Sequence, residues 1–139
     1  MAIRVYIVED HPLMRETLVA YLRLNSDIEL CGVVESAEQA TAGIEAADPS
    51  VVLVDLSLPG RSGLDLLKDI GDRWAYPCIV LSGHGEASYV VRALELGARG
   101  YILKGHPEEL PAAIRRVASG DVYVSPSLRG EPGDAKTGA

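Results

Sequence analysis

Short apolar stretches alternate with helix-like stretches along most of this chain. The apolar stretches span residues 3–8, 28–34, 51–54, 78–81 and 100–103, and they are rich in the β-branched residues that favour strands. Between them, apolar residues recur every three or four positions, which is the spacing of an amphipathic helix. The pattern predicts an α/β fold in which five strands alternate with five helices, with a parallel sheet covered on both faces.

Local signals predict where the helices begin. Pro12 suits the first position of a helix, with Asp10 or His11 as its cap. The last helix is expected to begin at Pro107, although Pro111 fits poorly inside it. The residues expected on the buried faces of the helices are Met14, Leu18, Tyr21, Leu22, Leu64, Leu67, Ile70, Ala87, Val91, Leu94, Leu110, Ile114 and Val117.

A single domain is expected. The chain has 139 residues, which is enough for one well-buried core. The periodic pattern ends near residue 124, and the segment after it is rich in Gly, Pro and small polar residues. These features predict a domain over residues 1–124 and a linker or flexible C-terminal tail over residues 125–139.

Composition and charge exclude several classes of protein. With 47% hydrophobic and 24% charged residues, the chain is expected to be globular. The net charge of -7 argues against nucleic-acid binding by this chain itself, because phosphate contacts need clustered Lys and Arg. No apolar run approaches a membrane span, and the N-terminus lacks the layout of a signal peptide, so a cytoplasmic protein is expected. Cys31 and Cys78 are interpreted as reduced core residues.

Polar residues follow four of the predicted strands directly. Glu9 and Asp10 follow the first strand, Asp55 the third, Ser82 the fourth and Lys104 the fifth. In an open parallel sheet, the site forms beyond the carboxyl ends of the strands, where the strand order reverses. If the order is 2-1-3-4-5, the first and third strands are neighbours. The sequence then predicts that these side chains gather at one edge of the sheet.

The predicted cluster has the parts of an aspartyl-phosphate site. Three carboxylates repel one another, so a cation is expected among them, and oxygen ligands favour Mg2+. The ion could bridge Asp10, Asp55 and a phosphoryl group, with Lys104 and Ser82 on the remaining phosphoryl oxygens. Each residue also has a plain interpretation, because Asp10 could cap a helix, Ser82 could sit in a turn and Lys104 could be solvated.

Four motifs carry a resemblance to a known family. They are IVEDHP, VVLVDLSLPGRSGLDLL, IVLSG and GARGYILKG. In the second motif, Pro59 and Gly60 predict a turn. With these motifs the chain resembles a two-component response-regulator receiver domain (CheY-like) over roughly residues 3 to 125. The stretches EDHPLMRETL, GARGYILK and PEELPAAIRRVASGDVYVSP are most similar to the NarL/LuxR-type subfamily. The resemblance implies a flavodoxin-like, doubly wound fold with a five-stranded parallel sheet of order 2-1-3-4-5.

The resemblance also implies a chemistry for the strand ends. Asp55 would accept a phosphoryl group from the phosphohistidine of a partner sensor histidine kinase, with Mg2+ as the cofactor. The implied metal ligands are Glu9, Asp10, Asp55 and the backbone carbonyl of Ser57. Lys104 would contact the phosphoryl group. Such a domain catalyses only its own phosphorylation and dephosphorylation, so a turnover enzyme is not expected.

Two further residues would act as the switch. Ser82 would move toward the phosphoryl group and Tyr101 would rotate inward behind it, whereas spacing alone favours a Tyr101 hydroxyl at the surface. The surface of the fourth helix, fifth strand and fifth helix would then change and control formation of a homodimer. Members of this subfamily usually carry a helix-turn-helix DNA-binding domain after the receiver. None follows here, so DNA is expected as a partner only through such a domain.

Three residues near the implied site depart from the family pattern or remain ambiguous. Many receivers have a proline with a cis bond after the lysine, whereas this chain has Gly105, which leaves the isomer of that peptide bond open. His84 occupies a position that tunes dephosphorylation in receivers, but an exposed loop histidine is the default interpretation. His11 is interpreted as a helix-start residue.

Three alternative functions have less support from the sequence. A haloacid-dehalogenase-type phosphatase also uses a strand-end aspartate, but it needs an acid two residues later, where this chain has Ser57. A nucleotide-binding domain needs a Gly-rich loop after the first strand, but residues 9–12 of this chain contain no glycine. A binding-only pseudo-receiver is disfavoured because each key position holds a chemically competent residue.

Overall fold

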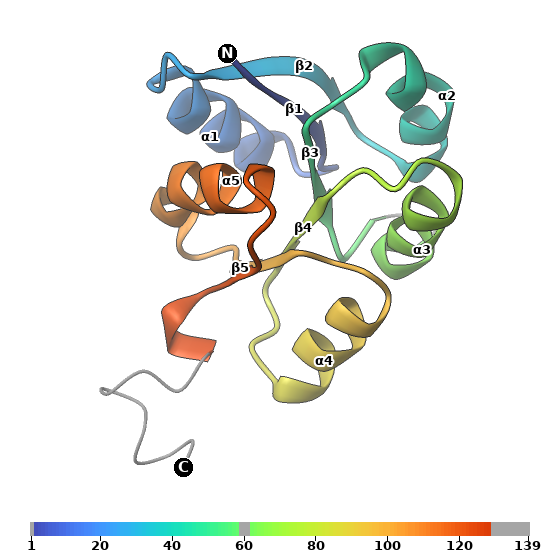
Figure 1. Cartoon of the computed structure of the whole chain (residues 1–139). Helices are drawn as coiled ribbons and strands as arrows, with labels where there is room; N and C mark the ends of the chain where they lie inside the picture. Colours follow the sequence, from blue (N-terminus) through green and yellow to red (C-terminus); the bar gives the residue numbers. More distant parts are fainter. Residues whose placement is uncertain (1, 59–61, 129–139) are drawn as a thin grey trace.

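A parallel sheet with helices on both faces forms the body of the molecule (Figure 1). The structure is a computed structural model, and it describes residues 2–58 and 62–128. The strand order is β2-β1-β3-β4-β5-β6. The turn predicted at Pro59 and Gly60 and residues 129–139 of the predicted tail lie outside the described residues.

Strands and helices alternate along the chain, as the hydrophobic pattern predicts. The strands are β1 (Ile3–Val8), β2 (Ile28–Val34), β3 (Val51–Asp55), β4 (Cys78–Ser82), β5 (Gly100–Leu103) and β6 (Tyr123–Val124). The helices are α1 (Pro12–Arg23), α2 (Ala37–Ala47), α3 (Gly63–Arg73), α4 (Ala87–Glu95) and α5 (Leu110–Ala118), with short 3-10 helices η1 (Pro107–Glu109) and η2 (Pro126–Leu128). No described helix is both long and apolar enough to cross a membrane.

The sheet separates two hydrophobic cores. One core packs α1 and α5 against one face of the sheet, and the other packs α2, α3 and α4 against the opposite face (Figure 1). Every residue of β3 and β4 is buried, because these strands have neighbours on both edges and helices on both faces. The near-continuous apolar composition of these strands follows from that position, and it fixes Asp55 at the end of the most enclosed part of the sheet.

The predicted fold class is confirmed, but the sheet has a sixth strand. β6 pairs in parallel with β5 through Gly100 with Tyr123 and Tyr101 with Val124. A strand of two residues is too short to leave a periodic pattern in the sequence. Ser125 is fully buried, and η2 follows it, so the described structure continues past the predicted boundary at residue 124.

The structure corrects the predicted start of the last helix. Pro107 begins η1, and α5 begins at Leu110. Pro111 therefore lies in the first turn of α5, where its missing N–H costs no helical hydrogen bond. Ser62 caps α3 through a hydrogen bond that its Oγ accepts from the N–H of Asp65 at 3.1 Å.

The predicted buried face of α4 is confirmed for Leu94 and is wrong for Ala87 and Val91. Ala87 and Val91 are exposed, whereas Ala93 is buried and Val90 and Leu94 pack against the core. Apolar residues occur on several sides of this helix, so two overlapping stripes have helical spacing. Packing against the sheet selects one of them, and periodicity alone does not.

Candidate functional site

The carboxyl ends of β1, β3, β4 and β5 lie at one edge of the sheet. β1 pairs with β3, with Val8 beside Val54, so the residues that follow these positions are also brought side by side. β1 lies between β2 and β3, which is the point where the strand order reverses. The topology therefore places Glu9 and Asp55 together at the position where parallel α/β sheets bind their ligands.

The predicted acidic cluster and its lysine come together. Glu9 and Asp55 are fully buried. Lys104 Nζ lies 3.0 Å from Asp55 Oδ1 and 3.6 Å from Glu9 Oε2. The backbone N–H of Ser57 donates a hydrogen bond to the same Asp55 Oδ1 at 3.0 Å. One oxygen of Asp55 is thus held by a cation and an amide. In the described residues there is no cis peptide bond, so the Lys104–Gly105 bond is trans.

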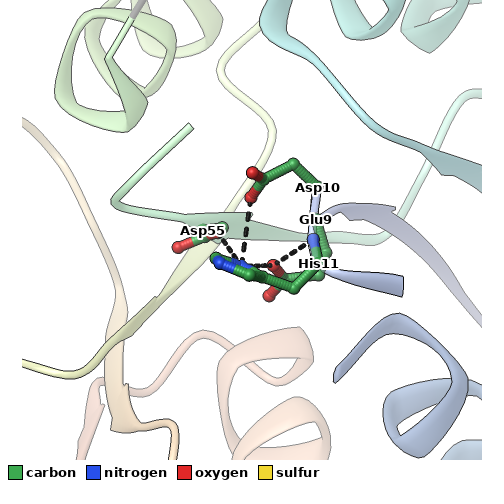
Figure 2. Close-up of side chains that lie close together, drawn as sticks. All are labelled: Glu9, Asp10, His11 and Asp55. Carbon is green, nitrogen blue, oxygen red and sulfur yellow. Dashed lines mark hydrogen bonds and ion pairs between the residues drawn. The ribbon is translucent and has the colours of Figure 1, made fainter. Parts of the chain in front are cut away.

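The ring of His11 lies among the three carboxylates, as Figure 2 shows. Its Nδ1 is 3.1 Å from Glu9 Oε2, 3.3 Å from Asp10 Oδ1 and 3.7 Å from Asp55 Oδ2. His11 is also the N-cap residue of α1, but its side chain makes no capping hydrogen bond. The predicted helix-start position of His11 is confirmed, whereas the contact of its ring with the acids was not predicted. The available signal was its position directly after the acidic pair.

Three buried carboxylate oxygens accept no hydrogen bond within the described part of the chain. They are Glu9 Oε1, Asp10 Oδ1 and Asp55 Oδ2. Buried anionic oxygens without partners are costly, and a cation bound among them would remove that cost. Glu9, Asp10 and Asp55 offer ligand atoms close enough to hold one ion, and carboxylate oxygens suit Mg2+. The residues present therefore fit a magnesium ion.

The pKa values of the two buried acids, Glu9 and Asp55, are shifted in opposite directions by burial and by the contacts of each side chain. Burial raises the pKa of Glu9, and its contact with Asp55 raises it further. Burial alone would also raise the pKa of Asp55. Contacts with Glu9, with the N–H of Ser57 and with Lys104 outweigh burial, so the pKa of Asp55 is lowered. Asp55 is thus held as a carboxylate, which is the form that a nucleophile requires.

The two predicted switch residues meet through the backbone of His84. Ser82 Oγ accepts a hydrogen bond from the N–H of His84 at 2.9 Å. The Tyr101 hydroxyl donates to the carbonyl of His84 at 2.7 Å. Tyr101 is fully buried, so the surface hydroxyl favoured by strand spacing is wrong. The loop from β4 to α4 therefore joins Ser82 to Tyr101.

The side chain of His84 faces α4. Its ring stacks on Tyr89 with centroids 4.4 Å apart, and its Nδ1 lies 3.7 Å from Glu86 Oε2. About half of the side chain is exposed. These contacts agree with the default interpretation of an exposed loop histidine, and they leave its backbone as the part that joins the switch residues.

Known proteins with similar sequences and structures are response regulators. A profile of the response regulator receiver domain matches residues 5–115. The transcriptional regulatory protein DegU of Brevibacillus brevis is 34% identical over 130 residues, which cover 91% of this chain and 54% of DegU. The nitrate/nitrite response regulator protein NarL of Escherichia coli K12 is 34% identical over 128 residues, which cover 89% of this chain and 58% of NarL.

Solved structures with a similar fold include a response-regulator domain. The isolated REC domain of RcsB from Salmonella enterica serovar Typhimurium, solved in the presence of the phosphomimetic BeF3-, superimposes with a TM-score of 0.86 at 25% identity. The alignment covers 93% of this chain and 97% of that domain. The chain spans little more than half the length of DegU and NarL, and it matches the isolated domain almost completely. This chain belongs to the response regulator receiver domain family.

Proposed function

We propose that this chain is a phosphorylation-dependent signalling switch of a two-component system, with Asp55 as the phosphoacceptor. The observation that carries the proposal is the asymmetry of the Asp55 carboxylate. Oδ1 is held by Lys104 and by the N–H of Ser57, whereas the buried Oδ2 accepts no hydrogen bond from the described residues. One oxygen is fixed and the other is available to attack.

The transfer forms one bond and breaks one. Asp55 Oδ2 attacks the phosphorus of a phosphohistidine, the P–N bond breaks, and its electron pair stays on the imidazole nitrogen. Lys104, at 3.0 Å from Asp55 Oδ1, lies close enough to contact the incoming phosphoryl oxygens. Glu9, Asp10, Asp55 and the carbonyl of Ser57 would hold Mg2+, which supplies positive charge to those oxygens when bound.

The switch would follow from a hydrogen bond to the new phosphoryl group. The Ser82 hydroxyl now accepts from the N–H of His84. Its movement toward the phosphoryl group would shift the His84 backbone, whose carbonyl holds the Tyr101 hydroxyl. The surface of α4, β5 and α5 would change with it. His84 would affect the rate of dephosphorylation through its place in this loop.

The partners belong to the proposal as well. A sensor histidine kinase would supply the phosphoryl group, and phosphorylation would favour a homodimer. DNA would be reached only through a helix-turn-helix domain, of the kind that regulators of this subfamily carry after the receiver. A cytoplasmic location suits such a partner. The alternative phosphatase chemistry has little support, because Ser57 stands where that chemistry needs an acid.

The direct test is phosphorylation by a small donor. The protein is incubated with Mg2+ and acetyl phosphate, and its intact mass is measured with and without alkali treatment. We expect one alkali-labile phosphoryl adduct on the wild type and none on Asp55→Asn. The matched control is Asp72→Asn, which removes an exposed acid of α3. An adduct on Asp55→Asn, or none on the wild type with several donors, would falsify the assignment.

The assembly is tested separately by light scattering. The molar mass is measured before and after phosphorylation, with the extent of phosphorylation read from the intact mass. We expect the mass to rise toward that of a dimer only in the phosphorylated sample. An unchanged mass at high phosphorylation would remove the dimer from the proposal and leave the phosphoacceptor in place.

A further inference from the structure

The free edge of β5 is covered by the segment 123–128, which we name the strap. The strap consists of β6, Ser125 and η2. It pairs with β5 at Tyr101 through Val124, and the N–H of Ser125 donates to the carbonyl of Tyr101 at 3.0 Å. The strap thus binds the backbone of Tyr101, whose hydroxyl donates to the carbonyl of His84 in the β4–α4 loop.

The side chain of Ser125 holds the strap by accepting a hydrogen bond that a backbone carbonyl would accept in a longer strand. Its Oγ accepts a hydrogen bond from the N–H of Leu103 at 3.3 Å, where a continuing parallel strand would offer a carbonyl. The same hydroxyl donates to Glu109 Oε1 at 2.9 Å. The freed carbonyl of Ser125 accepts from the N–H of Leu128 at 2.9 Å, which starts η2. Ser125 is fully buried, so each of these bonds is costly to lose.

Glu109 is the anchor for two strap hydroxyls. Its Oε1 accepts from Ser125 and also from the Tyr123 hydroxyl, at 3.3 Å. Glu109 lies in η1, the turn that follows Lys104 and precedes α5. The anchor therefore connects the strap to the segment that begins at the lysine of the phosphoacceptor site.

The strap also packs beside Tyr101 and the β4–α4 loop. Val124 and Leu128 pack against the hydrophobic core that contains Tyr101. Leu128 reaches the β4–α4 loop as well, because its Cδ2 would lie 3.2 Å from a β-carbon added to Gly85. Gly85 follows His84, whose carbonyl accepts the Tyr101 hydroxyl. Strap and loop together leave Tyr101 with no exposed surface.

We propose that docking of the strap on β5 holds Tyr101 in its inward position and is thereby coupled to the phosphorylation state of Asp55. The coupling rests on the proposed function, because phosphorylation of Asp55 supplies the input. Only two residues of β6 are paired, so docking of the strap depends on a small set of hydrogen bonds around Ser125 and can respond to a change at them. Thermodynamic linkage then requires reciprocity: phosphorylation tightens the strap, and loosening the strap disfavours the phosphorylated state of Asp55.

Two readouts on the full chain test the coupling. Amide hydrogen exchange follows the N–H groups of Leu103, Ser125 and Leu128 with and without Mg2+ and acetyl phosphate. Nitration by tetranitromethane, mapped by peptide mass, reports exposure of Tyr101, with the partly exposed Tyr21 of α1 as an internal standard. We expect phosphorylation to slow exchange at these amides. Ser125→Ala should speed nitration of Tyr101 by roughly tenfold or more, because the two buried hydrogen bonds of the Ser125 hydroxyl are lost.

Matched variants separate the strap from general damage. Ser119→Ala removes a hydroxyl that donates only to the carbonyl of Arg116, and it should behave like the wild type. Glu109→Ala removes the anchor and should act like Ser125→Ala, whereas Glu108→Ala should have no effect. Glu109→Ala also tests the proposal if Ser125→Ala does not fold.

The outcomes distinguish this inference from the proposed function. Intact mass reads phosphorylation independently of the strap. If the adduct forms but strap exchange is unchanged, or if Tyr101 stays equally protected from nitration in both anchor variants, the strap inference fails alone. If no adduct forms on the wild type, the proposed function fails. Nitration of the unphosphorylated variants then still decides whether the strap holds Tyr101 inward.

Discussion

Gly63 packs directly on the backbone of Asp55. A β-carbon at position 63 would overlap the Asp55 carbonyl oxygen and would lie 2.7 Å from Leu56 Cα. The N–H of Gly63 donates to the carbonyl of Leu56 at 3.2 Å, so α3 begins against the end of β3. The position of the Asp55 backbone thus depends on a side chain being absent from the neighbouring helix.

Gly63→Ala should destabilise the fold by about 1–3 kcal/mol, because backbone atoms of β3 must move to admit the methyl group. The measurement is the free energy of unfolding from urea titration. Gly71→Ala in the same helix is the control, since a β-carbon there meets nothing within 4 Å. It should be neutral or stabilising by about 0.5–1 kcal/mol. Equal losses for the two variants would contradict the packing argument.

Glu9→Gln should stabilise the protein when Mg2+ is absent. The pKa of Glu9 is raised above its ordinary value of 4.5, first by burial. Its contribution to stability is therefore full below the ordinary pKa and is lost as pH rises through the raised one. We expect a melting temperature a few degrees higher than that of the wild type at neutral pH, with the difference shrinking as the pH falls.

The same variant should lose the stabilisation that Mg2+ gives, because one ligand oxygen is removed. Thermal melts with and without Mg2+ provide the measurement. Glu16→Gln, an exposed position on α1, is the control and should keep the response of the wild type. A wild-type Mg2+ response in Glu9→Gln would exclude Glu9 from the metal site.

Lys104→Met should lower stability by about 1–3 kcal/mol, since two buried carboxylates lose their cation. Mg2+ should restore part of the loss by supplying positive charge at the same oxygens. Phosphorylation by acetyl phosphate should be slower as well. Lys68→Met, which removes an exposed pair on α3, should change neither quantity appreciably. Stability equal to the wild type without Mg2+ would show that Lys104 does not pair with the acids.

The two cysteines should differ in reactivity. Burial raises the pKa of Cys78 to about 12, and burial also raises the pKa of the partly buried Cys31. At pH 8 Cys78 has essentially no thiolate and no access, so iodoacetamide should label it only after unfolding. Cys31 should be labelled slowly in the native protein. Peptide mass identifies which cysteine is labelled. Labelling of Cys78 before Cys31 in the native protein would contradict the buried position of Cys78.

The acidic cluster could be predicted from sequence because it depends on topology. In a parallel sheet the carboxyl ends share one edge, so locating Glu9, Asp55 and Lys104 after their strands was enough to bring them together. The order of the strands and the alternation with helices followed from patterns that extend over many residues.

Features that depend on a few atoms could not be predicted. The ring of His11 turns toward the acids, and its position directly after the acidic pair does not decide which rotamer it adopts. On α4, packing selected Ala93 over Val91, although both fit helical spacing. β6 has two residues and exists because Ser125 and Glu109 hold it. Each of these features is fixed by tertiary contacts.

The enclosure of β3 contrasts with the edge of the sheet beside Tyr101. Asp55 stands at the end of a strand that is paired on both sides and buried along its whole length. Two strands away, the outer edge of β5 pairs only with the short β6, so Tyr101 lies next to the least extensively paired margin of the sheet. Backbone pairing thus decreases from the strand of Asp55 toward the edge beside Tyr101. Sequence changes that retune the response at this margin can accumulate while the geometry of the carboxylate stays constant.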